Sequence, residues 1–201
     1  MENSDSDILQ IRTIQQILLH SLIPVVCSAA IGFLYYRWNI FNPQFPRFQF
    51  VQSAAIASVF YYSLMYLSRR NAFGVLLILF LLVLLGSRST RLMYVLRDFF
   101  YTAAIAGAVL LYVRQLQGNP SLRGQYLGLV FSGILGVCTI VVWSIQYFIV
   151  QYLYRVHPPI PLMSFFSVAA FYGFLIGLGV GVGIVVNRRF LDREDRIKPA
   201  I

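Results

Sequence analysis

The chain has 201 residues, of which 59% are hydrophobic and 11% are charged, whereas an ordinary soluble domain is about 45–50% apolar and about 25% charged. So little charge cannot cover the surface of a soluble protein of this size, and the apolar residues occur in runs of roughly 20, the length of a helix that crosses a bilayer. The net charge of +9 would suggest nucleic acid as the partner of a soluble protein, but here it indicates loops that contact anionic headgroups, so the lipid bilayer and not nucleic acid is the predicted partner.

The predicted fold is an all-α polytopic transmembrane helical bundle, a single integral membrane domain over residues 1–201. About six spans with short loops are expected, at about 13–36, 50–67, 72–87, 92–113, 126–153 and 161–187, followed by a short charged tail at 188–201. The third span would be only about 24 Å long at a rise of about 1.5 Å per residue, which is a minimal crossing. A five-span alternative, in which this segment is re-entrant, therefore stays open.

The first span contains Pro24, which predicts a kink because proline lacks the N–H that would bond to a carbonyl of the preceding turn. A ligand or the hydroxyl of Ser21 could satisfy a carbonyl freed in this way. His20 and His157 have no acid or cysteine near them in the sequence, so no metal or acid–base role is predicted for either. Aromatic residues with polar groups are interpreted first as interface belts, and alternatively as the lining of a pocket: Tyr35, Tyr36, Trp38, Tyr61, Tyr62, Tyr147, Tyr152 and Tyr154.

Asp98 is the one candidate for chemistry, because it is the only carboxylate between Asp7 and Asp192. If the fourth span begins near Leu92, Asp98 lies about two turns inside it, where an ionisable side chain needs a partner and is a functional candidate. The predicted ligand-binding set is Asp98, Arg97, Arg91 and Arg88. In the alternative, the helix begins later and these residues lie at the interface, where the arginines anchor the chain to lipid.

Glycines recur at helical spacing in the last two predicted spans. Residues four apart share a helix face, and a row of small residues lets another helix approach closely. The predicted helix-packing residues are Gly173, Gly177, Gly181, Gly179 and Gly183 in the sixth span, and Gly128, Ser132 and Gly136 in the fifth. We interpret these rows first as contacts among the fifth, sixth and first spans, and alternatively as a face that binds a separate membrane subunit.

The distribution of basic residues predicts a multi-pass protein of the cell membrane with both termini in the cytoplasm. In that orientation ten Arg and Lys residues lie inside and six lie outside, in line with the positive-inside rule. The preference depends on the tail at 188–201, which holds five of the ten.

The leading functional hypothesis is a non-catalytic subunit or small-ligand-binding module of a membrane assembly such as a transporter, with other membrane subunits as possible partners. Catalysis is not favoured, because hydrolytic and transfer reactions need acids, bases or metals that this chain nearly lacks. Cys27 and Cys138 lie in predicted spans without a CxxC partner, so no metal site is predicted, and no cofactor. Two alternatives are a membrane enzyme or carrier that acts on an anionic lipid or metabolite through Asp98 and the arginine cluster, and a structural or assembly factor.

Overall fold

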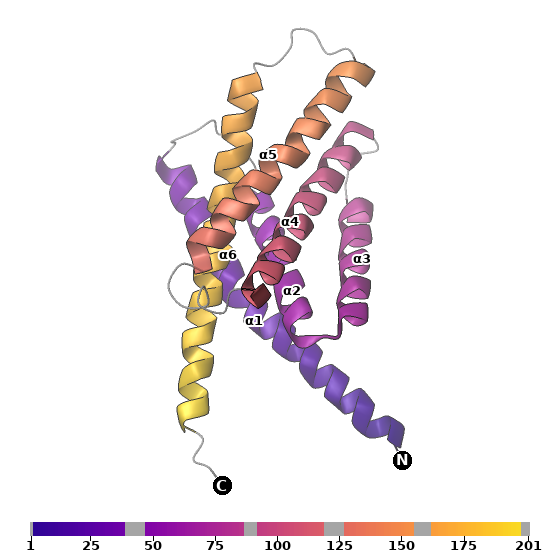
Figure 1. Cartoon of the computed structure of the whole chain (residues 1–201), viewed down its shortest axis with the longest axis vertical. Helices are drawn as coiled ribbons and strands as arrows, with labels where there is room; N and C mark the ends of the chain where they lie inside the picture. The colour runs from indigo at the N-terminus through magenta and orange to yellow at the C-terminus, as the bar shows by residue number, and fades with distance from the viewer. Residues whose placement is uncertain (1, 39–46, 87–91, 119–126, 155–161, 198–201) are drawn as a thin grey trace.

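The computed structural model describes residues 2–38, 47–86, 92–118, 127–154 and 162–197 (Figure 1). Within these ranges the chain is helical except at Leu67 and Ser68, between α2 and α3, and contains no strand. The six helices are α1 (Glu2–Trp38), α2 (Arg47–Tyr66), α3 (Arg69–Gly86), α4 (Leu92–Gly118), α5 (Leu127–Tyr154) and α6 (Leu162–Ile197). The all-α class predicted from hydropathy is therefore confirmed for the described part of the chain.

The helices differ from the predicted spans mainly at the two ends of the chain. α1 begins at Glu2 and not near residue 13, and α6 continues to Ile197 through most of the segment predicted as a tail. Hydropathy marks only the apolar part of a helix, whereas the backbone hydrogen bonds that define a helix continue into polar sequence. Both terminal helices are consequently longer than the apolar stretches within them.

Neighbouring helices run in alternating directions (Figure 1). The ends of α1 and α6 that carry the two chain termini lie at the same end of the bundle, together with the short connection between α2 and α3. α6 packs most extensively against α5 and also lies against α1, while α3 packs against α2 and α4 at the periphery. The core therefore centres on α6.

Within the described residues four helices contain a stretch long and apolar enough to cross a membrane, fewer than the six spans predicted. These stretches are Ile11–Tyr35 in α1, Asp98–Gly118 in α4, Gly128–Ile149 in α5 and Val168–Arg188 in α6. α3 contributes a shorter apolar stretch, Arg70–Leu79. Large apolar side chains such as Leu22, Val26 and Val137 are about three-fifths exposed on the outside of the bundle, as expected when lipid covers them. The chain is therefore described as a membrane protein.

Aromatic rings fill the half of the core nearer the start of α4. The rings of Tyr101 and Trp143 meet edge to face with centroids 4.5 Å apart, and those of Phe50 and Tyr172 meet in the same way at 4.7 Å. Such pairs add specific geometry to the burial of large apolar surfaces. They hold α2, α4, α5 and α6 together in this half of the bundle.

Buried hydroxyl groups are mostly satisfied within their own helices. Ser58 donates to the carbonyl of Ala54 at 2.6 Å, and Thr139 donates to that of Leu135 at 2.7 Å, in each case one turn back along the helix. Ser132 differs, because its hydroxyl donates from α5 to the carbonyl of Phe174 on α6 at 2.9 Å. This bond joins the two helices that share the largest interface.

Candidate functional site

Asn187 on α6 joins three helices through its side-chain amide. Its Nδ2 donates one hydrogen bond to the backbone carbonyl of His20 on α1, at 2.6 Å, and another to the hydroxyl of Tyr62 on α2, at 2.7 Å. Only 2% of Asn187 is exposed. Because a buried amide must place its hydrogens on acceptors, these two bonds fix α1, α2 and α6 relative to one another.

Pro24 explains why the carbonyl of His20 takes a donor from another helix. In a regular helix this carbonyl would accept the N–H of residue 24, which proline lacks. Ser21 does not replace it, because the Ser21 hydroxyl donates to the carbonyl of Ile17 at 2.6 Å. The role predicted for Ser21 is therefore wrong, and the donor comes from Asn187, far away in the sequence.

The imidazole of His20 lies against two tyrosine rings of α2. It stacks on Tyr66 with centroids 5.9 Å apart and planes at 20°, and it lies 5.7 Å from Tyr62 at 34°. His20 is half-buried, and its ring nitrogens form no hydrogen bond with another residue in the part of the chain that the structure describes. The ring is thus held in place by its faces.

We name His20, Tyr62, Tyr66, Asn187 and Arg188 the polar cluster. The polar cluster is the candidate functional site, and it differs from the site predicted from the sequence around Asp98. Two weak signals were present, since the pairs His20 with Pro24 and Tyr62 with Tyr66 are each spaced four apart. Nothing in a single sequence, however, brings together residues on three helices.

The interpretation of Tyr61 and Tyr62 as an interface belt is wrong. Their exposed fractions are 2% and 5%, and their rings meet edge to face with centroids 5.2 Å apart. Tyr112 of α4 is also buried and lies 6.1 Å from Tyr61, centroid to centroid. By composition alone, a pair of tyrosines in a span predicts an interface belt. The packing of α2 against α4 instead places these rings inside the bundle.

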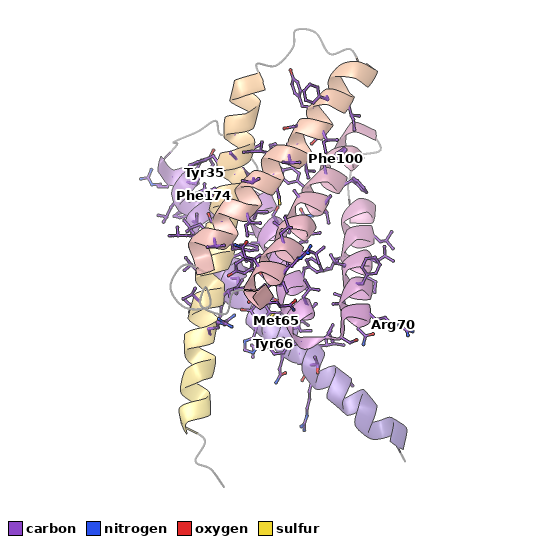
Figure 2. The ribbon with its side chains drawn as sticks, viewed as in Figure 1. Tyr35, Met65, Tyr66, Arg70, Phe100 and Phe174 are labelled. Carbon is purple, nitrogen blue, oxygen red and sulfur yellow. The ribbon has the colours of Figure 1, made fainter. Side chains whose placement is uncertain are left out.

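Positive charge gathers at the end of the bundle that holds the polar cluster. Arg188 follows Asn187 directly on α6 and lies near both Tyr62 and Tyr112. Arg12, Arg70 and Arg114 are exposed on α1, α3 and α4 at the same end, where Figure 2 labels Arg70 at the start of α3. Among the side chains that the structure describes the single acid, Asp98, is at the opposite end; the other six acids of the sequence belong to the terminal parts of α1 and α6, and their side chains lie outside the described residues. The described charged side chains near the polar cluster are arginines, which favour an anion.

Asp98, the candidate predicted from the sequence, lies in the second turn of α4 and is half-buried. Its backbone carbonyl accepts a hydrogen bond from the hydroxyl of Thr102 at 2.9 Å. Arg88 and Arg91 lie outside the described residues, as does the side chain of Arg97. The predicted cluster of Asp98 with these arginines thus stays a prediction, and the structure places Asp98 far from His20.

One row of glycines on α6 lies against α5. A Cβ on Gly177 would fall 2.7 Å from the Cα of Ser132, and Cβ atoms on Gly173 and Gly181 would collide with Thr139 and Gly128 respectively. Gly136 of α5 lies against the carbonyl of Ala170, where a Cβ would sit at 3.4 Å. The contacts at Gly173, Gly177 and Gly181 leave no room for side chains, whereas a Cβ at Gly136 would make an ordinary contact, so the two backbones approach most closely along the row on α6.

The second row on α6 lies against α1. A Cβ on Gly183 would collide with Pro24, and one on Gly179 would collide with Ser28. The close approach at Gly183 brings α6 to the turn of α1 that Pro24 interrupts, and Asn187 follows one turn later. Both glycine rows of α6 are therefore covered by helices of the same chain, and the second row places Asn187 at the carbonyl of His20.

Within the described residues no group of three or more His, Cys, Asp or Glu side chains is placed to hold a metal ion. Cys27 and Cys138 are both half-buried free thiols. Comparisons with protein-family models, with curated proteins and with solved structures find no match to this chain. The site must therefore be interpreted from its own geometry.

Proposed function

We propose that the chain is a multi-pass protein of the cell membrane that crosses the bilayer six times, with both termini in the cytoplasm. The alternating directions of the helices support this topology, because α2 and α3 run alongside the four long apolar helices (Figure 1). The 18 residues of α3 cover about 27 Å at about 1.5 Å per residue, close to the thickness of the hydrocarbon core. The basic residues of the terminal helices then face the cytoplasm.

We further propose that the protein is a non-catalytic small-ligand-binding module, working as a subunit of a membrane assembly such as a transporter. The observation that supports this most directly is the polar cluster. It combines a half-buried imidazole whose ring nitrogens have no partner among the described residues, tyrosine hydroxyls and a guanidinium, and it lies at one end of an apolar bundle. A few converging polar groups on an apolar scaffold are typical of sites that recognise small molecules.

The other hypothesis that the sequence raised, an enzyme or carrier acting through Asp98, has less support. General acid–base chemistry needs an acid and a base within hydrogen-bond reach of the same substrate. His20 and Asp98 lie at opposite ends of the bundle, so these two groups do not act on one substrate together. Recognition of a ligand needs only the groups that the polar cluster already brings together.

Purification from the native host in mild detergent, followed by mass spectrometry of proteins and small molecules, tests the proposal. A small molecule or lipid bound in stoichiometric amount would support the ligand-binding module. A stoichiometric membrane partner, such as an ATPase or a permease, would support the role as a subunit. A chain that purifies alone, with neither a partner nor a bound molecule, would contradict the proposed function.

A further inference from the structure

We infer that the polar cluster binds a phosphate-type anionic group at the basic end of the bundle. This inference rests on the proposed ligand-binding function and adds the chemical class of the ligand. The group could belong to a lipid headgroup or to a free phosphate, since both present the same oxygens to the protein. Three observations carry the inference: the donors in the cluster, the charge around it and its level in the bundle.

The donors come from side chains whose positions are already fixed. Nδ2 of Asn187 gives both of its hydrogens to His20 and Tyr62, so the Tyr62 oxygen serves as an acceptor in that bond. The hydroxyl of Tyr62 keeps its own hydrogen for another acceptor. His20, held by the tyrosine rings, offers a ring N–H from the same side of α2. An anion oxygen is the acceptor that suits both donors.

The charge around the cluster selects an anion over a cation. Aromatic faces such as those of Tyr62 and Tyr66 also attract cations. Here, however, Arg188 lies near Tyr62, and the exposed charged side chains that the structure describes at this end are three arginines. A bound cation would be repelled by this field, whereas an anion would gain charge-assisted hydrogen bonds.

The level of the cluster suits a charged group. Arg188 is the last residue of the apolar stretch Val168–Arg188 in α6, and Tyr66 is the last residue of α2. Tyr66 is 40% exposed, so the cluster opens to the outside at this level. Tyrosine and arginine at the end of a span lie at the headgroup region, where phosphate groups of lipids are abundant. His20 itself is the tenth residue of the apolar stretch Ile11–Tyr35 of α1, so a ligand would reach it past Tyr66, from the edge of the apolar region.

The test compares His20→Phe and Arg188→Gln with wild type. His20→Phe keeps a ring against Tyr62 and Tyr66 but removes both nitrogens, so the helix contacts remain. The matched control is Arg37→Gln, which removes an exposed arginine at the opposite end of the same helix, α1. Two probes are titrated into the purified protein while its melting temperature is followed: inorganic phosphate in detergent, and phosphatidylglycerol against phosphatidylcholine in nanodiscs.

We expect binding of one probe to be about tenfold weaker in His20→Phe and in Arg188→Gln and unchanged in Arg37→Gln, since each variant loses a hydrogen bond to a charged group. A response to inorganic phosphate would identify a free anion as the ligand, and a response in nanodiscs without one to inorganic phosphate would identify a lipid headgroup. Because phosphatidylcholine carries the same phosphodiester, equal responses to the two lipids would show recognition of the phosphate group and not of the net charge of the headgroup. If Arg188→Gln fails to fold, the comparison of His20→Phe with Arg37→Gln decides.

Equal responses in all four proteins, or none in wild type, would overturn the inference. The proposed function would survive that result if the natively purified protein carried a bound uncharged or cationic molecule. It would fall together with the inference only if native purification yielded neither a ligand nor a partner.

Discussion

A proline inside a membrane-embedded helix leaves one carbonyl without its usual donor, and in lipid that carbonyl must find another. In this chain the carbonyl belongs to His20, and Asn187 supplies the donor from α6. The same amide also bonds to Tyr62, so one side chain offsets the defect in α1 and links it to α2. A single substitution of Asn187 is therefore expected to weaken the contacts that hold α1, α2 and α6 together.

We expect Asn187→Leu to lower the free energy of unfolding by roughly 1–3 kcal/mol for each acceptor or donor left unsatisfied. The cost should be smaller in a Pro24→Ala background, because alanine at position 24 restores the N–H that the carbonyl of His20 lacks. Equilibrium unfolding of the four proteins in mixed micelles gives the coupling between the two positions. Strictly additive effects would show that the two positions are not coupled through the carbonyl of His20.

At the scale of the helices, α6 depends on the absence of side chains along two of its faces. We expect Gly177→Ala to destabilise the protein by roughly 1–3 kcal/mol, because the new Cβ would meet the backbone of Ser132 on α5. The matched control is Gly133→Ala on α5, where nothing lies within 4 Å of the added Cβ. There alanine should stabilise the helix by up to about 1 kcal/mol. Equilibrium unfolding measures both variants. A change in the free energy of unfolding in the same direction for both would contradict this packing.

The helices themselves followed from the sequence more directly than the site did. Runs of apolar residues fix where helices lie, because a span must bury its own backbone hydrogen bonds. The bounds of α4 and α5 accordingly agree with their predicted spans within a few residues, except at the polar end of α4, which continues to Gly118. Helix ends in polar sequence, such as those of α1 and α6, carry no hydropathy signal and were missed.

The site could not be predicted because its residues acquire meaning only through contacts between helices. His20 has no chemical partner within its own turn of helix, and its neighbours Tyr62 and Tyr66 come from α2. Asp98 was predicted as a site because an acid is rare in apolar sequence, which is a property of composition. The residues of the polar cluster are not unusual in this sequence, and Asp98 is not among them.

At the scale of the whole molecule, the bundle has an apolar exterior and a core that contains hydroxyls, an amide and many aromatic rings. Exposed residues on α1 such as Leu19 and Val26 are matched by Val137 and Val141 on α5, all of them at least about half exposed. This distribution is that of a bundle surrounded by lipid, since water would leave such a surface prone to association. The proposed six-span topology requires that α2 and α3 cross the same bilayer as the four long apolar helices.

Labelling of single cysteines from each side of the membrane tests this requirement. In a background with Cys27→Ala and Cys138→Ala, we expect Arg12→Cys and Arg70→Cys to react with an impermeant maleimide from the cytoplasmic side only, and Arg37→Cys from the opposite side only. The reason is that α2 and α3, if they cross, carry Arg70 back to the level of Arg12, as the alternating helices place it. If α2 and α3 instead enter and leave the membrane without crossing it, Arg70→Cys will not react from the side that labels Arg12→Cys. The chain would then have four spans, those of α1, α4, α5 and α6.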